Sequence, residues 1–234
     1  MSRARVKCRV FVDFDGTIAP VDTTDLQLER FAAPAWREIE DDWKAGRIGS
    51  RECLVRQIDL VRASEAQMDA FVAGIEIDSG FARFARLCRR LGHSVTIVSD
   101  GLDRTIEAVL ERYDLDLPFH ANRLQWQGGD RWRLTFPHAS SDCRALAGTC
   151  KCRFLEGQPR QLRIVVGDGR SDFCVADHRA DLVLAKGALL DRCRASAIPH
   201  LAFTDFDQAS LQLAGWLEHR QFAEIGEPAA RAED

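Results

Sequence analysis

The spacing of hydrophobic residues divides the chain into a short strand, a helical stretch and a region where strands alternate with helices. Val10, Phe11 and Val12 form the β-branched and aromatic run of a buried strand. Between residues 22 and 73, hydrophobic residues recur three, four and seven positions apart. Since one face of an amphipathic helix has this spacing, the pattern predicts a helical module directly after the first strand.

From Gly80 onward, helical and extended patterns alternate. Helices are predicted over 81–91, 103–112, 144–155 and 172–177, and from Ala188 and Asp207; strands are predicted over 93–98, 119–124, 163–166 and 182–184, with a hairpin over 124–134. Such alternation is typical of a parallel sheet with helices on both faces. We therefore predict an α/β fold with a Rossmann-like, mostly parallel sheet.

The helical stretch interrupts this fold, so we predict two units. The core comprises residues 1–18 and 79–225, and a small helical cap comprises residues 19–78; the polar residues 226–234 are a predicted disordered tail. Ligands of open parallel sheets bind beyond the carboxyl ends of the strands. An insertion after the first strand lies above that edge and can act as a lid.

Composition mainly excludes classes of partner. The formal net charge of −4 gives no field that would attract nucleic acid or an anionic membrane. No hydrophobic run approaches the ~20 residues that span a bilayer, and no export signal precedes the first strand. We expect a cytoplasmic monomer or homodimer without nucleic-acid or membrane partners, whose eight cysteines are reduced thiols.

Two carboxylates, Asp13 and Asp15, follow the first strand directly, and Gly16 allows the backbone to turn after them. Such a pair offers a nucleophile and an acid/base partner. A plain Asp-Gly turn has the same pattern, so the choice depends on downstream segments. The loop after the strand 163–166 adds two more carboxylates, Asp168 and Asp172. Clustered carboxylates repel one another and raise each other's pKa unless a cation is bound between them. Oxygen ligands of this kind suit Mg²⁺.

Two further segments complete a set suited to phosphoryl transfer. Ser99, Asp100 and Gly101 supply a hydroxyl and backbone amides where a strand meets a helix, a favourable place for an anion. Lys151 is the candidate lysine, with Lys186 as the alternative. A carboxylate nucleophile, Mg²⁺, a lysine and a hydroxyl can position a phosphoryl group and neutralise the charge on its oxygens.

These four segments, in this order, resemble the haloacid dehalogenase superfamily of phosphohydrolases over about the whole chain. Asp13-Phe14-Asp15-Gly16-Thr17 followed by Gly167-Asp168-Gly169-Arg170-Ser171-Asp172 is a specific combination. The cap after the first motif resembles the phosphoserine phosphatase-like branch. The resemblance implies a haloacid dehalogenase-like (HAD-like) fold, Mg²⁺ as cofactor and a small phosphorylated metabolite as substrate.

By this resemblance, Asp13 is the nucleophile that forms an aspartyl phosphate. Asp15 protonates the leaving oxygen and then activates water. Asp13, the backbone carbonyl of Asp15 and Asp168 hold Mg²⁺, supported by Asp172. The implied phosphate-binding residues are Ser99, with its neighbours Asp100 and Gly101, and Lys151, whose place in the order of motifs favours it over Lys186.

Within the family, the stretches 31–36, 137–143 and 148–152 resemble the methionine-salvage branch, which acts on 2-hydroxy-3-keto-5-methylthiopentenyl-1-phosphate. The loop 167–174 is also similar to that of phosphoethanolamine/phosphocholine phosphatases. A phosphoserine phosphatase, a phosphotransferase and a non-enzymatic phosphate-binding protein are further alternatives. Aligned with phosphoserine phosphatases, the acidic position that meets the substrate amine falls on Asp22, and the arginine position that meets its carboxylate falls on Gln57. Because glutamine cannot neutralise a carboxylate, a keto, polyol or amino-alcohol phosphate is expected over phosphoserine.

Cys143, Cys150 and Cys152, with His138, offer a possible zinc site. Their spacing lacks the recurring Cys-x₂-Cys pairs of common zinc modules. Packing of reduced thiols is therefore the preferred interpretation.

Overall fold

The computed structural model describes residues 7–156 and 161–226 and contains a seven-stranded sheet with the order β4-β3-β2-β1-β5-β6-β7. The strands are β1 (Cys8–Val12), β2 (Ser94–Leu102), β3 (Phe119–Trp126), β4 (Trp132–Thr135), β5 (Leu162–Gly167), β6 (Leu182–Ala185) and β7 (His200–Ala202). Neighbouring strands run parallel except for the antiparallel β3–β4 hairpin. The predicted mostly parallel α/β fold is confirmed.

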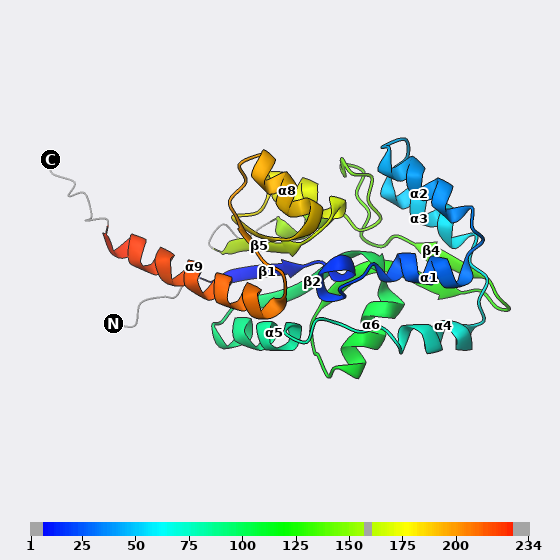
Figure 1. Ribbon diagram of the computed structural model, residues 1–234, viewed down its shortest axis with the longest axis horizontal. Coiled ribbons are helices and arrows are strands. Elements are labelled where there is room, and N and C mark those ends of the chain that lie inside the picture. Colours follow the sequence, from blue (N-terminus) through cyan, green and yellow to red (C-terminus); the bar gives the residue numbers. More distant parts are fainter. Residues whose placement is uncertain (1–6, 157–160, 227–234) are drawn as a thin grey trace.

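Helices cover both faces of the sheet (Figure 1). They are α1 (Thr23–Phe31), α2 (Trp36–Lys44), α3 (Ser50–Ile58), α4 (Glu65–Val72), α5 (Phe81–Arg90), α6 (Asp103–Arg112), α7 (Phe173–His178), α8 (Gly187–Ala195) and α9 (Phe206–Gly226). Among the described residues, no helix combines the length and hydrophobicity needed to cross a membrane.

The central strand β1 is buried from both sides, which explains its continuous hydrophobic run. Val10 and Val12 belong to the core cluster beneath α5 and α9. Phe11 points to the opposite face and packs with Val165 of β5 and Val175 of α7. Beyond Val12, the backbone amide of Asp13 still donates to the carbonyl of Val166, at 2.9 Å. This bond places Asp13 at the carboxyl edge of the sheet.

Helices α1 to α4 lie between β1 and α5 in the chain, in the stretch predicted as a cap. They share a small hydrophobic core with the β3–β4 hairpin, in which Leu28, Trp36 and Met68 meet Leu124 and Trp132. In Figure 1 the α2–α3 pair lies beside the β4 end of the sheet. The boundaries 19–78 stay a prediction, and the predicted tail from residue 227 onward lies outside the described residues.

The predicted helix over 144–155 is wrong, because only Lys151–Leu155 is helical, as a 3-10 turn. Leu146 adopts a left-handed φ of 49°. The backbone amide of Thr149 donates to the Asp100 carboxylate at 2.8 Å. This tertiary hydrogen bond occupies an amide that would donate to a backbone carbonyl if the segment were helical. Two smaller differences concern strands: β2 continues through Ser99–Gly101 to Leu102, and the short, half-buried β7 was missed.

Candidate active site

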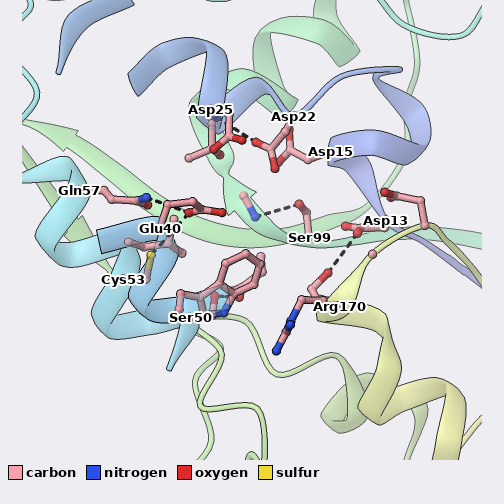
Figure 2. Close-up of a pocket in the computed structure, with 18 residues that line it drawn as sticks. Asp13, Asp15, Asp22, Asp25, Glu40, Ser50, Cys53, Gln57, Ser99 and Arg170 are labelled. Carbon is pink, nitrogen blue, oxygen red and sulfur yellow. Dashed lines mark hydrogen bonds between the residues drawn. The ribbon is translucent and has the colours of Figure 1, made fainter. Parts of the chain in front are cut away.

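Side chains from four separate segments meet at the carboxyl edge of the sheet, below the α2–α3 pair. Three of these segments line a cavity of about 140 Å³, shown in Figure 2, and the fourth, which carries Lys151, is not part of this lining. Its lining includes Asp13 and Asp15 from the end of β1, Ser99 from β2 and Asp168 from the loop after β5. The edge that the strand pattern predicted as the site is therefore where these residues gather.

Lys151 lies at the base of the site between two carboxylates. Its Nζ is 2.8 Å from Asp13 Oδ2 and 2.7 Å from Asp172 Oδ1, and the three side chains are 6%, 6% and 1% exposed. Burial alone would lower the pKa of Lys151, but the charges of Asp13 and Asp172 outweigh it and raise that pKa. Lys151 is thus held as a cation beside the predicted nucleophile. Lys186, the alternative, instead donates to the Thr17 carbonyl, at 3.3 Å.

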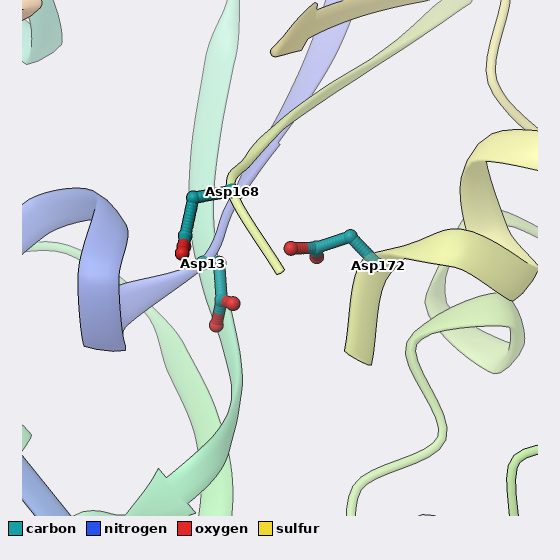
Figure 3. Close-up of side chains that lie close together, drawn as sticks. All are labelled: Asp13, Asp168 and Asp172. Atoms are coloured by element: carbon teal, nitrogen blue, oxygen red, sulfur yellow. The ribbon is translucent and has the colours of Figure 1, made fainter. Parts of the chain in front are cut away.

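Asp13, Asp168 and Asp172 form a group of carboxylates whose nearest oxygens all lie within 4.8 Å of one another (Figure 3). Thr17 Oγ1 donates to Asp168 Oδ1 at 2.6 Å. Burial, followed by the charge of Asp13, raises the pKa of Asp168 to about 6 despite this hydrogen bond. Three converging carboxylates form a donor set of oxygen atoms alone, which fits Mg²⁺.

Asp15 turns away from this group towards the start of α1. Its Oδ1 accepts hydrogen bonds from the Thr23 amide at 2.8 Å and from Thr23 Oγ1 at 2.5 Å. Burial and the charge of Asp22 nevertheless raise the pKa of Asp15 well above its ordinary value. A carboxyl group whose pKa is raised holds its proton more readily, which is what a general acid requires.

Two glycines leave the space that these carboxylates occupy. Gly16 has a left-handed φ of 69°, and a Cβ atom there would collide with the Asp168 carboxylate. A Cβ atom on Gly101 would collide with the Asp15 carboxylate. Gly16 therefore allows the backbone to turn after β1 and also leaves space for the Asp168 carboxylate. Gly101 leaves space for the Asp15 carboxylate.

Ser99 is buried beside the cavity, and its Oγ accepts a hydrogen bond from the Gly101 amide at 2.9 Å. Asp100 has protein partners on both of its carboxylate oxygens. It accepts from Ser50 Oγ of α3, from Asn122 Nδ2 at 3.1 Å and from the Thr149 amide. We propose that Asp100 ties the cap and the loop before Lys151 to β2 and does not itself contact the phosphate.

The two residues predicted to meet the rest of the substrate line the cavity, but each has a partner. Asp22 caps α1 by accepting from the Asp25 amide at 2.9 Å, and burial together with the charge of Asp25 raises its pKa to about 6. Gln57 Nε2 donates to Glu40 Oε2 at 2.9 Å. Asp25 and Glu40 also line the cavity and were missed. Glu40 lies in the acidic run 40–42, where nothing in the sequence separates it from solvent-exposed acids.

The four possible zinc ligands do not form a close set of ligand atoms. Cys143 and Cys150 pack with Ala147, Cys152 packs against this cluster, and His138 lies edge-on to Phe154. Over residues 7–156 and 161–226, the aspartate group is the only close set of three or more potential metal ligands. All eight cysteines are free thiols, with Cys152 Sγ 3.5 Å from Cys174 Sγ.

Comparison with known proteins connects this geometry to one family. A model of haloacid dehalogenase-like hydrolases matches residues 10–177. A 2-hydroxy-3-keto-5-methylthiopentenyl-1-phosphate phosphatase of Brevibacillus brevis is 32% identical over 86% of this chain and 92% of that protein. The protein of the same name from Geobacillus kaustophilus is 31% identical over 84% of this chain and 91% of that protein. A substrate-bound phosphoserine phosphatase has a similar structure, with a TM-score of 0.67 and 19% identity over 92% of this chain and 99% of that chain.

Proposed function

The chain belongs to the haloacid dehalogenase-like hydrolase family, and on that premise we propose that it hydrolyses a small phosphomonoester through Asp13. The family and the phosphatase class predicted from the four segments are confirmed. The observation that carries the proposal is the buried contact of Asp13 with Lys151, 2.8 Å apart, at the end of β1. A carboxylate held beside a buried cation can attack a phosphorus atom whose oxygens that cation also attracts.

We propose the following roles. An Asp13 oxygen attacks phosphorus while the bond from phosphorus to the leaving oxygen breaks, and Asp15 gives its proton to that oxygen. Asp15 then takes a proton from water as the water attacks phosphorus and the bond to Asp13 breaks. Lys151 and Ser99 hold the phosphoryl oxygens throughout. The raised pKa of Asp15 supports its role as the proton donor of the first step.

We propose that Asp13 and Asp168, supported by Asp172, hold Mg²⁺. When bound, the ion neutralises negative charge on the phosphoryl oxygens and on the carboxylates around them. The support is the donor set, because the carboxylate oxygens of these residues lie within 4.8 Å of one another. Among the described residues, Lys151 and, at Asp168, Lys186 are the cations whose charges act on these three carboxylates, which leaves room for a further cation.

For the substrate, we propose 2-hydroxy-3-keto-5-methylthiopentenyl-1-phosphate, on which the named relatives act. The cavity supports this choice, because Trp43, Cys53 and Leu54 give it an apolar side suited to a methylthio group. Its carboxylates can accept a hydrogen bond from the substrate hydroxyl. The same carboxylates favour phosphoethanolamine as the second candidate, since Asp22 and Asp25 would meet its ammonium group.

Phosphate release from a set of phosphomonoesters tests the proposal. We expect kcat/KM for the methylthio-keto substrate, or failing it for phosphoethanolamine, to exceed that for phosphoserine by at least roughly tenfold, which is about 1.4 kcal/mol of transition-state binding. Asp13→Asn serves as the inactive control. Phosphoserine as the best substrate would contradict the substrate assignment, and no phosphate release from any ester would contradict the proposed function.

A further inference from the structure

Glu40 is a buried carboxylate beside the cavity whose position is held by side chains of a neighbouring helix. It belongs to α2, is 9% exposed and lines the cavity. Gln57 of α3 donates to its Oε2 at 2.9 Å, and Cys53 Sγ lies 3.8 Å from the same oxygen. Figure 2 shows Glu40 and Gln57 joined by this hydrogen bond. Gln57 therefore holds the Glu40 carboxylate, which changes what the sequence alone assigned to Gln57.

Acidic side chains predominate in the lining of the cavity to which Glu40 belongs. The lining contains seven carboxylate side chains and one arginine. That arginine, Arg170, donates to the Lys44 carbonyl at 3.1 Å and lies over the Trp43 ring. Lys44 Nζ is 3.4 Å from Glu40 Oε1, but its side chain is 57% exposed, so solvent screens this pair. Glu40 also acts on its neighbours, because its charge helps to raise the pKa values of Asp22 and Asp25 after burial has done so.

We propose that Glu40, positioned by Gln57, determines specificity: it repels phosphate esters whose leaving alcohol carries a carboxylate and accepts a hydrogen bond from a hydroxyl group. The inference rests on the proposed function, since it assigns the substrate class of that same cavity. Two like charges brought together in a partly desolvated site are strongly unfavourable. The relevant class is thus neutral, hydroxyl-bearing phosphate esters, which includes the proposed keto substrate.

Glycerol 3-phosphate and 3-phosphoglycerate test this directly, because they differ only in a terminal alcohol against a carboxylate. Each is measured as a competitive inhibitor of aryl phosphate hydrolysis, so neither has to be turned over. We expect the wild-type protein to bind glycerol 3-phosphate roughly tenfold more tightly or better. In Glu40→Gln, which can keep the hydrogen bond to Gln57, that ratio should fall by roughly tenfold. In Gln57→Met, the Glu40 carboxylate loses the hydrogen bond from Gln57, so the affinity ratio should fall by less than in Glu40→Gln.

Glu38→Gln is the matched control, because it removes the same charge from an exposed position two residues earlier on α2. It should keep the wild-type ratio. An unchanged ratio in Glu40→Gln, or a wild-type preference for 3-phosphoglycerate, would overturn the inference. If wild-type protein does not hydrolyse the aryl phosphate, the proposed function fails instead, and the two esters are then compared on the same proteins by calorimetry, with the same expected ratios.

Discussion

Replacing Lys151 with methionine would test how the base of the site is stabilised. Methionine has a similar length and keeps most of the apolar stem, so the main loss is the ammonium group. That group lies 2.8 Å from Asp13 and 2.7 Å from Asp172, and all three side chains are at least nine-tenths buried. The variant leaves two buried carboxylates, and Asp168 beside them, without their cation.

Removing one partner of a buried ion pair costs about 3–5 kcal/mol of folding free energy. For a chain of this size, each kcal/mol corresponds to about 2–4 °C in melting temperature, so we expect a loss of about 6–20 °C. The loss depends on pH. Asp168 has a folded-state pKa of about 6 against an ordinary value of 3.8. The contribution of Asp168 to the free energy of unfolding is therefore fully present at pH values below its ordinary pKa. It is lost as pH rises through the folded-state pKa. Without Lys151 the carboxylates repel more strongly, so the deficit should grow over this window and be largest above it.

Thermal unfolding at about pH 5 and about pH 8 measures the effect. Lys7→Met, at an exposed position, is the control for the loss of one positive charge. Added Mg²⁺ should restore part of the stability of Lys151→Met at the higher pH and have little effect on the melting temperature at the lower pH. If Lys151→Met melts within about 2 °C of Lys7→Met at the higher pH, the buried cation does not stabilise the site.

Two further substitutions test the acid/base residue. Asp15→Asn should lower kcat/KM, which reports formation of the phosphoenzyme, far more for alkyl phosphates than for aryl phosphates, whose leaving groups need little protonation; an equal loss of kcat/KM for both would show that Asp15 is not the general acid. Gly101→Ala should displace the Asp15 carboxylate and lower kcat by roughly 100-fold. Gly215→Ala is the control, because there is open space around that glycine, and it should keep the wild-type kcat. Full activity of Gly101→Ala would mean that the position of Asp15 is not critical.

Local sequence patterns predicted most strands and helices in their order along the chain, although β7 was missed and the helix over 144–155 was wrong. Asp13 and Asp168 follow hydrophobic strands that the sheet makes neighbours, so their meeting could be predicted from the strand ends alone. Lys151 was found by its place between the second and fourth segments, although the helix assigned around it was wrong. Its backbone follows a tertiary contact, the Thr149 amide on Asp100, which periodicity does not encode.

The pairings on the cap side of the cavity could not be read from the sequence, because they join side chains of different helices. Gln57 was assigned to the substrate, and the structure shows that it holds Glu40, seventeen positions earlier in the chain. Asp100 was grouped with Ser99 and Gly101 for the backbone amides of this segment, and the structure adds partners for its carboxylate from α3, β3 and a distant loop. A single sequence does not show which side chains that lie far apart along the chain will pair. The end of a strand, in contrast, can be predicted from the hydrophobic run that precedes it.

Acid-quench mass spectrometry of the phosphorylated protein tests the central claim most directly. Asp15→Asn incubated with an aryl phosphate should accumulate the intermediate, because the first step needs little protonation while the second lacks its base. We predict a phosphoryl group on the peptide that contains Asp13, and its absence in the Asp13→Asn, Asp15→Asn double variant. A phosphoryl group on a different residue, or the same labelling in the double variant, would contradict catalysis through Asp13.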